Sequence, residues 1–406
     1  MRGEGRERVP IWRGSKYLGC MTSLVRGMSI FRITAHQTRP LLMLMPTLRT
    51  LLSIALLLQF FVASATPADE LARGEAVYKA NCASCHGPNG NPDPESPLVQ
   101  ALGIVPADLA DPLFNSREPV SAWKTVVTHG GPALRCSAMM PPLGSSLSYA
   151  EIDSVLTYVK TTLGGAHDYP DGDLNLYLPV RTKKAFPEDE WVWKTRYTGT
   201  DGSDSWKNIL EYEFRIGTRA QGVLEVTHET GGRKSQFGHL EPGLKYVLSH
   251  NRAAGYILTG AVQVGVPLND DAHWELLPYL ALGKIISPSW TFQGSARLKL
   301  DLEDSDKSSG ELAGIVHWTH TETARSVFPA LEVVADVPFH RESGPGRADA
   351  VQFSVVPQAR IGLNRRGNIA LNVGAEVPVN ETDRYDWRGY VYFIWDFADG
   401  GLLEGW

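Results

Sequence analysis

The chain has 406 residues, more than one ordinary domain usually holds, so two folding units are expected. Hydrophobic residues make up 43% of the chain and charged residues 21%, and the formal net charge is −6. The chain lacks the basic excess that nucleic-acid binding requires, so no nucleic-acid partner is expected, and the composition fits a globular or β-barrel protein.

The first 65 residues are predicted to be an N-terminal extension and a signal peptide. Arg49 precedes an apolar run over residues 51–62, and the small residues Ala63-Ser64-Ala65 follow it. This order is typical of a secretory signal, and we expect cleavage after Ala65. The run is shorter than the about 20 residues that span a bilayer as a helix, and an uncleaved anchor is the alternative. Residues 1–44 are Arg-rich and patternless, and we interpret them as an over-long gene start before Met45.

The next feature along the chain is the segment Cys82-Ala-Ser-Cys85-His86. The pattern Cys-x-x-Cys-His lets two thiols bond to the vinyl groups of a haem and lets the adjacent histidine ligate the iron from the proximal side. A redox disulfide would need a βαβ pattern and a zinc site would need a second ligand pair, and neither follows. The sequence therefore predicts one covalent haem c, with Cys82 and Cys85 as thioether sites and His86 as the proximal iron ligand.

A candidate for the sixth iron ligand lies about fifty residues further on, in Met139-Met140-Pro141-Pro142. A thioether is a natural distal ligand, and His/Met ligation raises the haem potential. Met140 is the predicted distal ligand, with Met139 as the runner-up and His129 as a third, bis-histidine alternative. Iron with both axial positions filled has no open position for oxygen or peroxide. We therefore expect no catalytic residues and favour an electron carrier over an enzyme.

Residues 68 to 164 resemble the class I cytochrome c family. Gly74 and Tyr78 match the Gly-x-x-x-aromatic pattern of that family's first helix, and Met140 is followed by proline, as the axial methionine of the family typically is. The resemblance implies an all-α domain, over residues 66–165, in which Tyr158 on the last helix packs against the first helix. It also implies that Pro106 and its neighbours line the haem pocket.

The last helix of this domain is also predicted from the residues themselves. Ser148 and Glu151 form a capping box, and apolar residues recur at helical spacing after it, namely Ile152, Val155, Leu156 and Val159. Gly164-Gly165 ends the helix.

Two cysteines remain outside the haem motif. Cys20 lies in the part that is predicted to be removed, which leaves Cys136 without an intramolecular partner. An odd thiol in an exported protein is either a buried free cysteine or a reactive one, and we favour the buried one.

Residues 166–190 are rich in Asp, Pro and Gly and are predicted to be a linker. Strand periodicity begins at Trp191, and it is clearest from Trp290 to Glu303. There, apolar side chains occupy the even positions and polar ones the odd positions. This run exceeds an ordinary soluble strand of about 5 to 6 residues and covers the about 9 to 11 needed to cross a bilayer.

Eleven further segments alternate in the same way, and short joins such as residues 217–220 and 364–367 indicate antiparallel neighbours. The segments are 191–198, 209–217, 221–229, 244–250, 255–268, 273–286, 310–323, 327–340, 350–364, 367–380 and 386–397. They predict an all-β antiparallel barrel of about 12 strands over residues 191–406, with a β-sandwich as the alternative. In a membrane barrel the apolar face meets lipid, and polar residues such as Glu211, Glu213 and Arg215 line the lumen.

The end of the chain favours the outer membrane as the location of this barrel. Residues 387–397 are strongly aromatic, and the chain ends at Trp406, which resembles the aromatic C-terminal signal of bacterial outer-membrane barrels. Residues 206 to 397, with Glu241-Pro-Gly-Leu-Lys-Tyr-Val-Leu, resemble outer-membrane "transporter" barrels associated with aromatic-degradation operons. We expect an exported protein whose haem domain is periplasmic and whose C-terminal domain lies in the outer membrane.

The histidines of the second half indicate no metal site. His317 and His320 are three residues apart, which places them on opposite faces of a strand, and the others are isolated. No Ser/His/Asp, phosphate-loop or metalloprotease pattern is present. The leading hypothesis is therefore one-electron transfer between redox partner proteins by a mono-haem cytochrome tethered to a barrel. The alternatives are a fused cytochrome-porin that oxidises extracellular Fe(II), and a transport barrel with a haem sensor domain.

Overall fold

The computed structural model describes residues 67–165, 167–200, 204–232, 234–339, 351–380, 384–404 and 406. The predicted extension, signal peptide, Met45 start and Cys20 lie outside the described residues. In the described part of the chain, no helix is long and apolar enough to cross a membrane.

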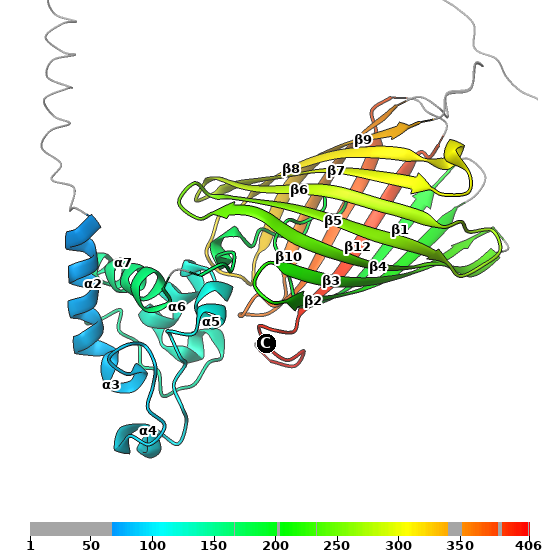
Figure 1. The fold of residues 1–406 in the computed structure, drawn as a ribbon. Helices are drawn as coiled ribbons and strands as arrows, with labels where there is room; N and C mark the ends of the chain where they lie inside the picture. The colour runs from blue at the N-terminus through cyan, green and yellow to red at the C-terminus, as the bar shows by residue number, and fades with distance from the viewer. Residues whose placement is uncertain are drawn as a thin grey trace, which may run out of the picture. The chain divides into compact units, whose positions relative to one another are not determined.

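The first described part, up to residue 165, is helical, as predicted (Figure 1). Its elements are α2 (Pro67–Asn81), α3 (Ala83–His86), α4 (Pro97–Leu102), α5 (Pro112–Arg117), α6 (Val120–His129), the 3-10 turn η2 (Gly131–Leu134), α7 (Tyr149–Tyr158) and the π-helical turn η3 (Val159–Leu163). Pro97 and Pro112 each stand in the first helical turn, where the missing N–H removes no helical hydrogen bond.

Helices α2 and α7 pack tightly against each other through Gly74. A Cβ atom at this position would lie 2.2 Å from the carbonyl oxygen of Ser154, so only glycine allows this close approach. One turn further on, Tyr78 is fully buried, and its ring centroid lies 5.7 Å from that of Tyr158. The capping box of Ser148 and Glu151 is present at the start of α7. The aromatic packing and the capped final helix expected from the sequence are therefore confirmed.

The second part is a closed antiparallel barrel of twelve strands within the described residues. The strands are β1 (Glu190–Gly199), β2 (Ser205–Ile216), β3 (Ala220–Gly231), β4 (Lys234–Asn251), β5 (Tyr256–Pro267), β6 (Glu275–Ser287), β7 (Trp290–Asp301), β8 (Ser309–Trp318), β9 (Val327–Pro338), β10 (Gln352–Gly362), β11 (Ile369–Pro378) and β12 (Trp387–Asp396). Each strand pairs with the next, and β1 pairs with β12, so that Glu190 faces Asp396. The predicted barrel is confirmed, and the β-sandwich alternative is wrong.

The two faces of the barrel have opposite character. On β7, Trp290 and Leu298 point outward with 46% and 42% of their surface exposed, whereas Gln293 and Ser295 point inward and are buried. Glu211 and Glu213 of β2 are likewise buried on the inner face. A soluble barrel would bury its apolar face, so this arrangement is the inverse of a soluble one and matches the polar lumen and apolar exterior of transmembrane barrels.

Aromatic side chains form two belts on the outer face. We call the end that holds Glu190 and Asp396 the near end, and the end that holds Gly199 and Trp387 the far end. Exposed outward aromatic residues near the near end are Trp191, Phe214, Tyr246, Trp290 and Trp318, and those near the far end are Trp206, Phe237, Trp274, Phe353 and Trp387. Between the belts the exposed residues are aliphatic, among them Leu224, Leu244, Leu280, Leu331 and Val391. Such belts lie where a bilayer meets water.

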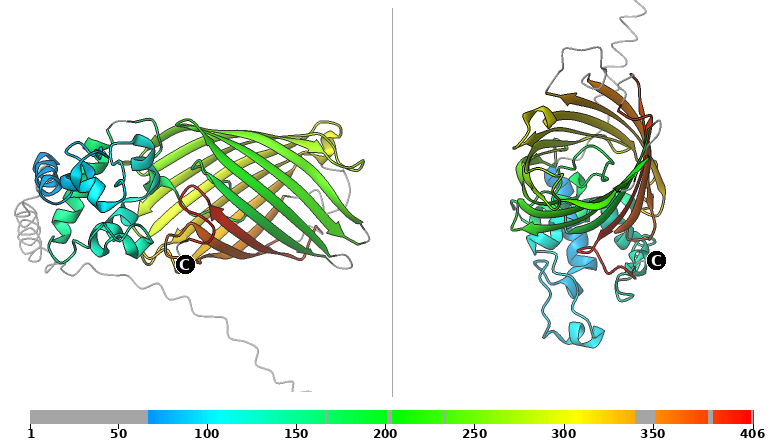
Figure 2. Two further views of the ribbon diagram at one scale, coloured as in Figure 1. Left: turned by 90° about the horizontal axis from the view of Figure 1, so that it is seen from below. Right: turned by 90° about the vertical axis from the view of Figure 1, so that its right-hand side faces the viewer.

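The segment expected to be a linker, residues 166–190, joins the two parts, but most of it is not exposed to solvent. Residues 174–189, here called the plug, lie inside the ring of strands when the barrel is viewed end-on (Figure 2). Leu174, Ala185 and Phe186 of the plug are buried against Val247, Ile257 and other inward side chains. The plug therefore occupies part of the lumen.

Side chains that line the lumen donate hydrogen bonds to backbone carbonyl groups of the plug. Plug carbonyls accept hydrogen bonds from Gln293 (2.7 Å, Tyr177 O), Tyr392 (2.6 Å, Val180 O), Thr259 (2.7 Å, Ala185 O) and Lys245 (3.0 Å, Phe186 O). An irregular segment cannot satisfy its own backbone groups, so these inward donors make its burial possible.

Candidate functional site

The predicted haem motif occupies one helical turn. The N–H of His86 donates to the carbonyl of Cys82 at 3.0 Å, and the N–H of Cys85 donates to the same carbonyl at 3.1 Å. Residues at i, i+3 and i+4 share a helix face, so Cys82, Cys85 and His86 present their side chains on one side of α3. Both cysteines are partly buried, and neither forms a disulfide. Burial raises the pKa of Cys82 to about 11, so its thiol is protonated at neutral pH.

The protonation of His86 follows from its partner. Its Nδ1 atom lies 2.9 Å from the carbonyl oxygen of Ala107, and because a carbonyl only accepts, Nδ1 carries the proton. The other ring nitrogen, Nε2, then has a free lone pair. Burial lowers the pKa of His86, which keeps the ring neutral at pH 7. A neutral imidazole whose Nδ1–H is held by a backbone carbonyl is the usual arrangement of a metal-ligating histidine.

The glycine pair after α6 supports the loop that carries Met140. The N–H of Gly131 donates to the carbonyl of Met140 at 3.0 Å, and a Cβ on Gly131 would lie 2.1 Å from the carbonyl of Ser137. Gly130 has a φ of 82° and is also in close contact with this loop. Sequence reasoning assigned these glycines no role. Their role is to let the methionine loop approach α6.

The three candidates for the distal ligand differ in exposure. Met139 is 49% exposed, and His129 is exposed at the end of α6. Met140 is partly buried, so its side chain fits a buried ligand best.

Cys136, expected to be a buried free cysteine, is instead exposed, because the loop after η2 faces solvent there. That interpretation of Cys136 was wrong.

The donor set fits a haem. Two thiols and an imidazole with a free Nε2 stand on one helical turn, and the only reaction they need for attachment is thiol addition to vinyl groups. In the described residues, no cluster of three or more His, Cys, Asp or Glu side chains could hold a metal ion by itself. His317 is buried in the barrel beside Tyr177 of the plug, with ring centroids 6.0 Å apart.

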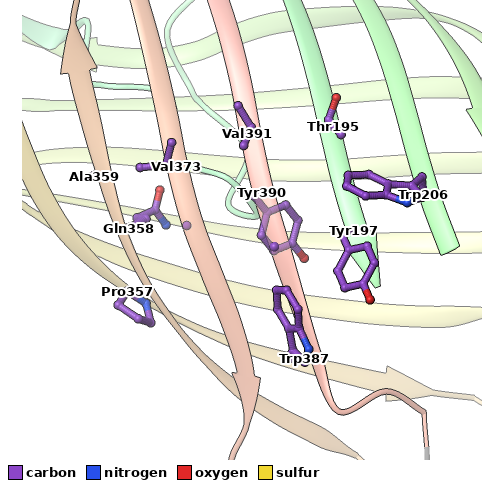
Figure 3. Close-up of a pocket in the computed structure, with 12 residues that line it drawn as sticks. Thr195, Tyr197, Trp206, Pro357, Gln358, Ala359, Val373, Trp387, Tyr390 and Val391 are labelled. Carbon is purple, nitrogen blue, oxygen red and sulfur yellow. The ribbon is translucent and has the colours of Figure 1, made fainter. Parts of the chain in front are cut away.

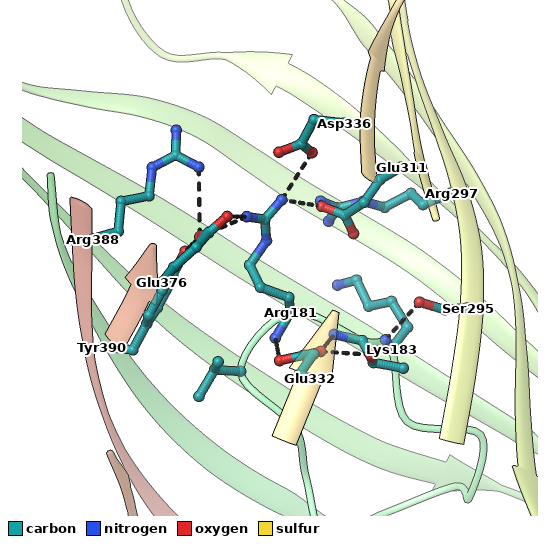
Figure 4. A network of polar contacts seen from close by, with 12 residues as sticks. Arg181, Lys183, Ser295, Arg297, Glu311, Glu332, Asp336, Glu376, Arg388 and Tyr390 are labelled. Carbon is teal, nitrogen blue, oxygen red and sulfur yellow. Dashed lines mark hydrogen bonds and ion pairs between the residues drawn. The ribbon is translucent and has the colours of Figure 1, made fainter. Parts of the chain in front are cut away.

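A second cluster of functional side chains, which sequence reasoning missed, surrounds Arg181 of the plug (Figure 4). The guanidinium donates to Glu376 of β11 at 2.6 and 2.8 Å, to Asp336 of β9 at 2.9 Å, and to Glu311 of β8. The Arg181 side chain is 9% exposed, and Glu376 is fully buried. Glu332 of β9 accepts from the backbone N–H and the hydroxyl of Thr182. The basic run Arg181-Thr-Lys-Lys184 facing a set of inward glutamates was the signal available in the sequence.

The outer face of the barrel carries a shallow apolar furrow of about 770 Å³ along β10 to β12 and β1 (Figure 3). Trp206 and Trp387 close it at the far end, and Val373 and Val391 form its floor. Small side chains such as Ala359 leave the space. It belongs to the apolar surface that faces lipid in a membrane barrel.

Comparison with known proteins identifies the first part of the chain. Residues 69–159 match the family described as cytochrome C oxidase, cbb3-type, subunit III. The match covers less than half of the chain, and it shows a cytochrome c domain, which implies a haem cofactor. A search of curated proteins finds no match to the chain.

The second part is similar in fold to outer-membrane porins and channels. A KdgM porin in complex with disordered oligogalacturonate is 12% identical to this chain. The matched region covers 51% of this chain and 99% of the porin, with a TM-score of 0.38. An outer-membrane channel from Pseudomonas putida F1 is 11% identical, with coverages of 54% and 99% and a TM-score of 0.42. A NanC porin is 10% identical, with coverages of 50% and 98% and a TM-score of 0.37.

Proposed function

We propose that the chain is an exported c-type cytochrome that transfers single electrons between periplasmic redox partners and is held at the outer membrane by its plugged barrel. The observation that carries the electron-transfer part is the geometry of α3 in a cytochrome c domain. There, Nδ1–H of His86 is held by Ala107 and Nε2 is free to ligate iron.

In this proposal Cys82 and Cys85 attach one haem covalently, and His86 and Met140 are its axial ligands. The bound haem supplies the one-electron iron couple. The chain orients the imidazole through Ala107, brings the methionine loop close through Gly130 and Gly131, and excludes water from the core around Tyr78. Two filled axial positions leave no open iron position for substrate, which supports a carrier over an enzyme.

The outer-membrane location is supported by the barrel itself. Its apolar exterior, polar lumen and two aromatic belts are those of a membrane-spanning barrel. The near end carries the first and last strand ends and short turns such as Pro288-Ser289, which is typical of the periplasmic side. The haem domain, which precedes β1, would then be periplasmic.

The plug favours an anchoring role for the barrel over an open channel. Buried ion pairs and backbone hydrogen bonds hold residues 174–189 in the lumen. A lumen filled in this way does not give Fe(II) or a solute a free path. The conduit and transport alternatives would require the plug to leave.

The test is membrane fractionation combined with a haem stain and spectroscopy. The stained band should appear in the outer-membrane fraction, survive boiling in detergent because the haem is covalent, and show a low-spin spectrum with a reversible one-electron couple. Recovery of the protein in the soluble fraction without detergent would contradict the membrane part alone. Loss of stain on denaturation would contradict covalent attachment. Haem reduction by Fe(II) added outside intact cells would favour the conduit alternative.

A further inference from the structure

The lumen contains a small cavity of about 120 Å³ between the plug and the strands, and the side chains of Arg196 and Lys207 line it toward the far end. Its walls are strongly basic. Three carboxylates line it, Glu211, Glu213 and Glu225, against eight basic side chains, which are Arg181, Lys183, Lys184, Lys194, Arg196, Lys207, Lys245 and Arg297.

Seven of these eight basic side chains have a carboxylate partner within ion-pair distance among the described residues. Lys207 pairs with Glu229 at 2.9 Å and Arg297 pairs with Glu311 at 3.1 Å, for example. The remaining pairs involve Arg181, Lys183, Lys184, Lys194 and Lys245. Arg196 is the exception. No described residue forms an ion pair or hydrogen bond with its guanidinium, and its Nε is buried without a partner.

The neighbours of Arg196 add to the positive charge. On the inner face, Arg196 of β1 stands directly opposite Lys207 of β2, and Arg388 of β12 stands opposite Thr198, two residues along from Arg196. Arg388 stacks on Tyr385 at 3.6 Å and lies 3.7 Å from Glu376, but its Nε is also buried and unpaired. Like charges directly across a strand pair destabilise a sheet unless a counter-charge lies between them.

Water reaches this part of the lumen from the far end. The Lys299 side chain, on the inner face of β7, is 44% exposed, Arg297 is 32% exposed, and Glu229 of β3 is 52% exposed. Glu229, the carboxylate next to this group, is already bound to Lys207. A small solute that enters at the far end would therefore meet Arg196 with its donors free.

The geometry points to an oxyanion-binding site at Arg196, with Arg388 and Lys207 alongside, that takes a small carboxylate or phosphate. A planar guanidinium donates two parallel hydrogen bonds to such a group, and one bound anion would supply the counter-charge that Arg196 lacks. The site lies inside the barrel and contains no residue of the haem motif, so it does not depend on the haem chemistry. In the proposed orientation it opens to the outside of the cell.

The experiment measures binding of inorganic phosphate, and separately of succinate, to the full-length haem-loaded protein in detergent by calorimetry. Sodium chloride at equal ionic strength serves as the reference. We expect saturable binding of at least one of the two anions, and the stronger of the two shows whether phosphate or carboxylate is preferred. Arg196→Gln should weaken that binding at least tenfold.

Lys299→Gln is the matched control, because it removes an inward cation of the same half of the lumen that already has a carboxylate partner, Glu275, at 2.6 Å. It should leave the affinity within twofold of wild type. Arg196→Lys keeps the charge but loses the bidentate geometry, so it should weaken binding less, and it also tests the site if Arg196→Gln does not fold. Absence of saturable binding beyond chloride, or equal affinities in wild type and both Arg196 variants, would overturn the proposal.

Discussion

Removal of Arg181 is expected to release the plug. This guanidinium bridges Glu376, Asp336 and Glu311, which come from three different strands, and its side chain is 9% exposed. In an Arg181→Gln variant these carboxylates lose their counter-charge inside the lumen, while their desolvation remains. Breaking a buried ion pair in this way costs about 3–5 kcal/mol. Asp336 is 19% exposed, so water screens one of the three, and we expect about 3 kcal/mol.

A loss of about 3 kcal/mol raises the population of barrels with a displaced plug on the order of 100-fold. The assay is single-channel recording in planar bilayers with the full-length, haem-loaded protein. Wild type should be closed with rare openings, and Arg181→Gln should open far more often. Hydrogen exchange of the amides in residues 174–189 should become faster in parallel, because they lose the strands that protect them.

The control is Arg219→Gln, which removes an arginine whose partner, Asp168, is 72% exposed. An exposed pair contributes about 0–1 kcal/mol, so this variant should behave like wild type. If Arg181→Gln stays closed with unchanged exchange, the ion pairs do not hold the plug. Continuous conductance of wild-type protein would show that the plug does not close the lumen at all.

Three further outcomes follow from the helical domain. Met140→Ala should abolish the low-spin absorption spectrum while Met139→Ala keeps it, and a low-spin spectrum in both would refute the ligand assignment. Gly74→Ala should destabilise the domain by about 1–3 kcal/mol in denaturant titrations followed at the haem band, because the new Cβ meets the Ser154 carbonyl; an unchanged midpoint would contradict the close crossing. Burial lowers the pKa of Lys160 to about 8, below the unfolded value of 10.5, so the unfolded chain binds more protons between these values. Stability should therefore rise as pH increases from about 8 to 10.5, and Lys160→Met should flatten this rise; an equal slope in both proteins would exclude Lys160 as the cause.

The sequence alone was sufficient for the features that depend on neighbours along the chain. Cys82, Cys85 and His86 fall on one helical turn wherever that turn lies, so their spacing predicts their common face. The capping box at Ser148 and the alternation from Trp290 to Glu303 are local in the same way. Side chains alternate between the two faces of a strand in every kind of sheet. The sequence therefore predicted the number of strands and which residues share a face.

Only the tertiary structure decided what each face meets. An alternating strand is the same in a sandwich and in a barrel, and closure between β1 and β12 made the polar face a lumen. The composition of residues 166–190 predicts a connecting segment, but whether such a segment is solvated or buried depends on donors from distant strands, such as Gln293 and Tyr392. The partners of Arg181 and the lack of a partner for Arg196 are likewise set by cross-lumen distances. The sequence determined the haem motif and the strands. Closure of the barrel determined that residues 174–189 lie in its lumen and not in solvent.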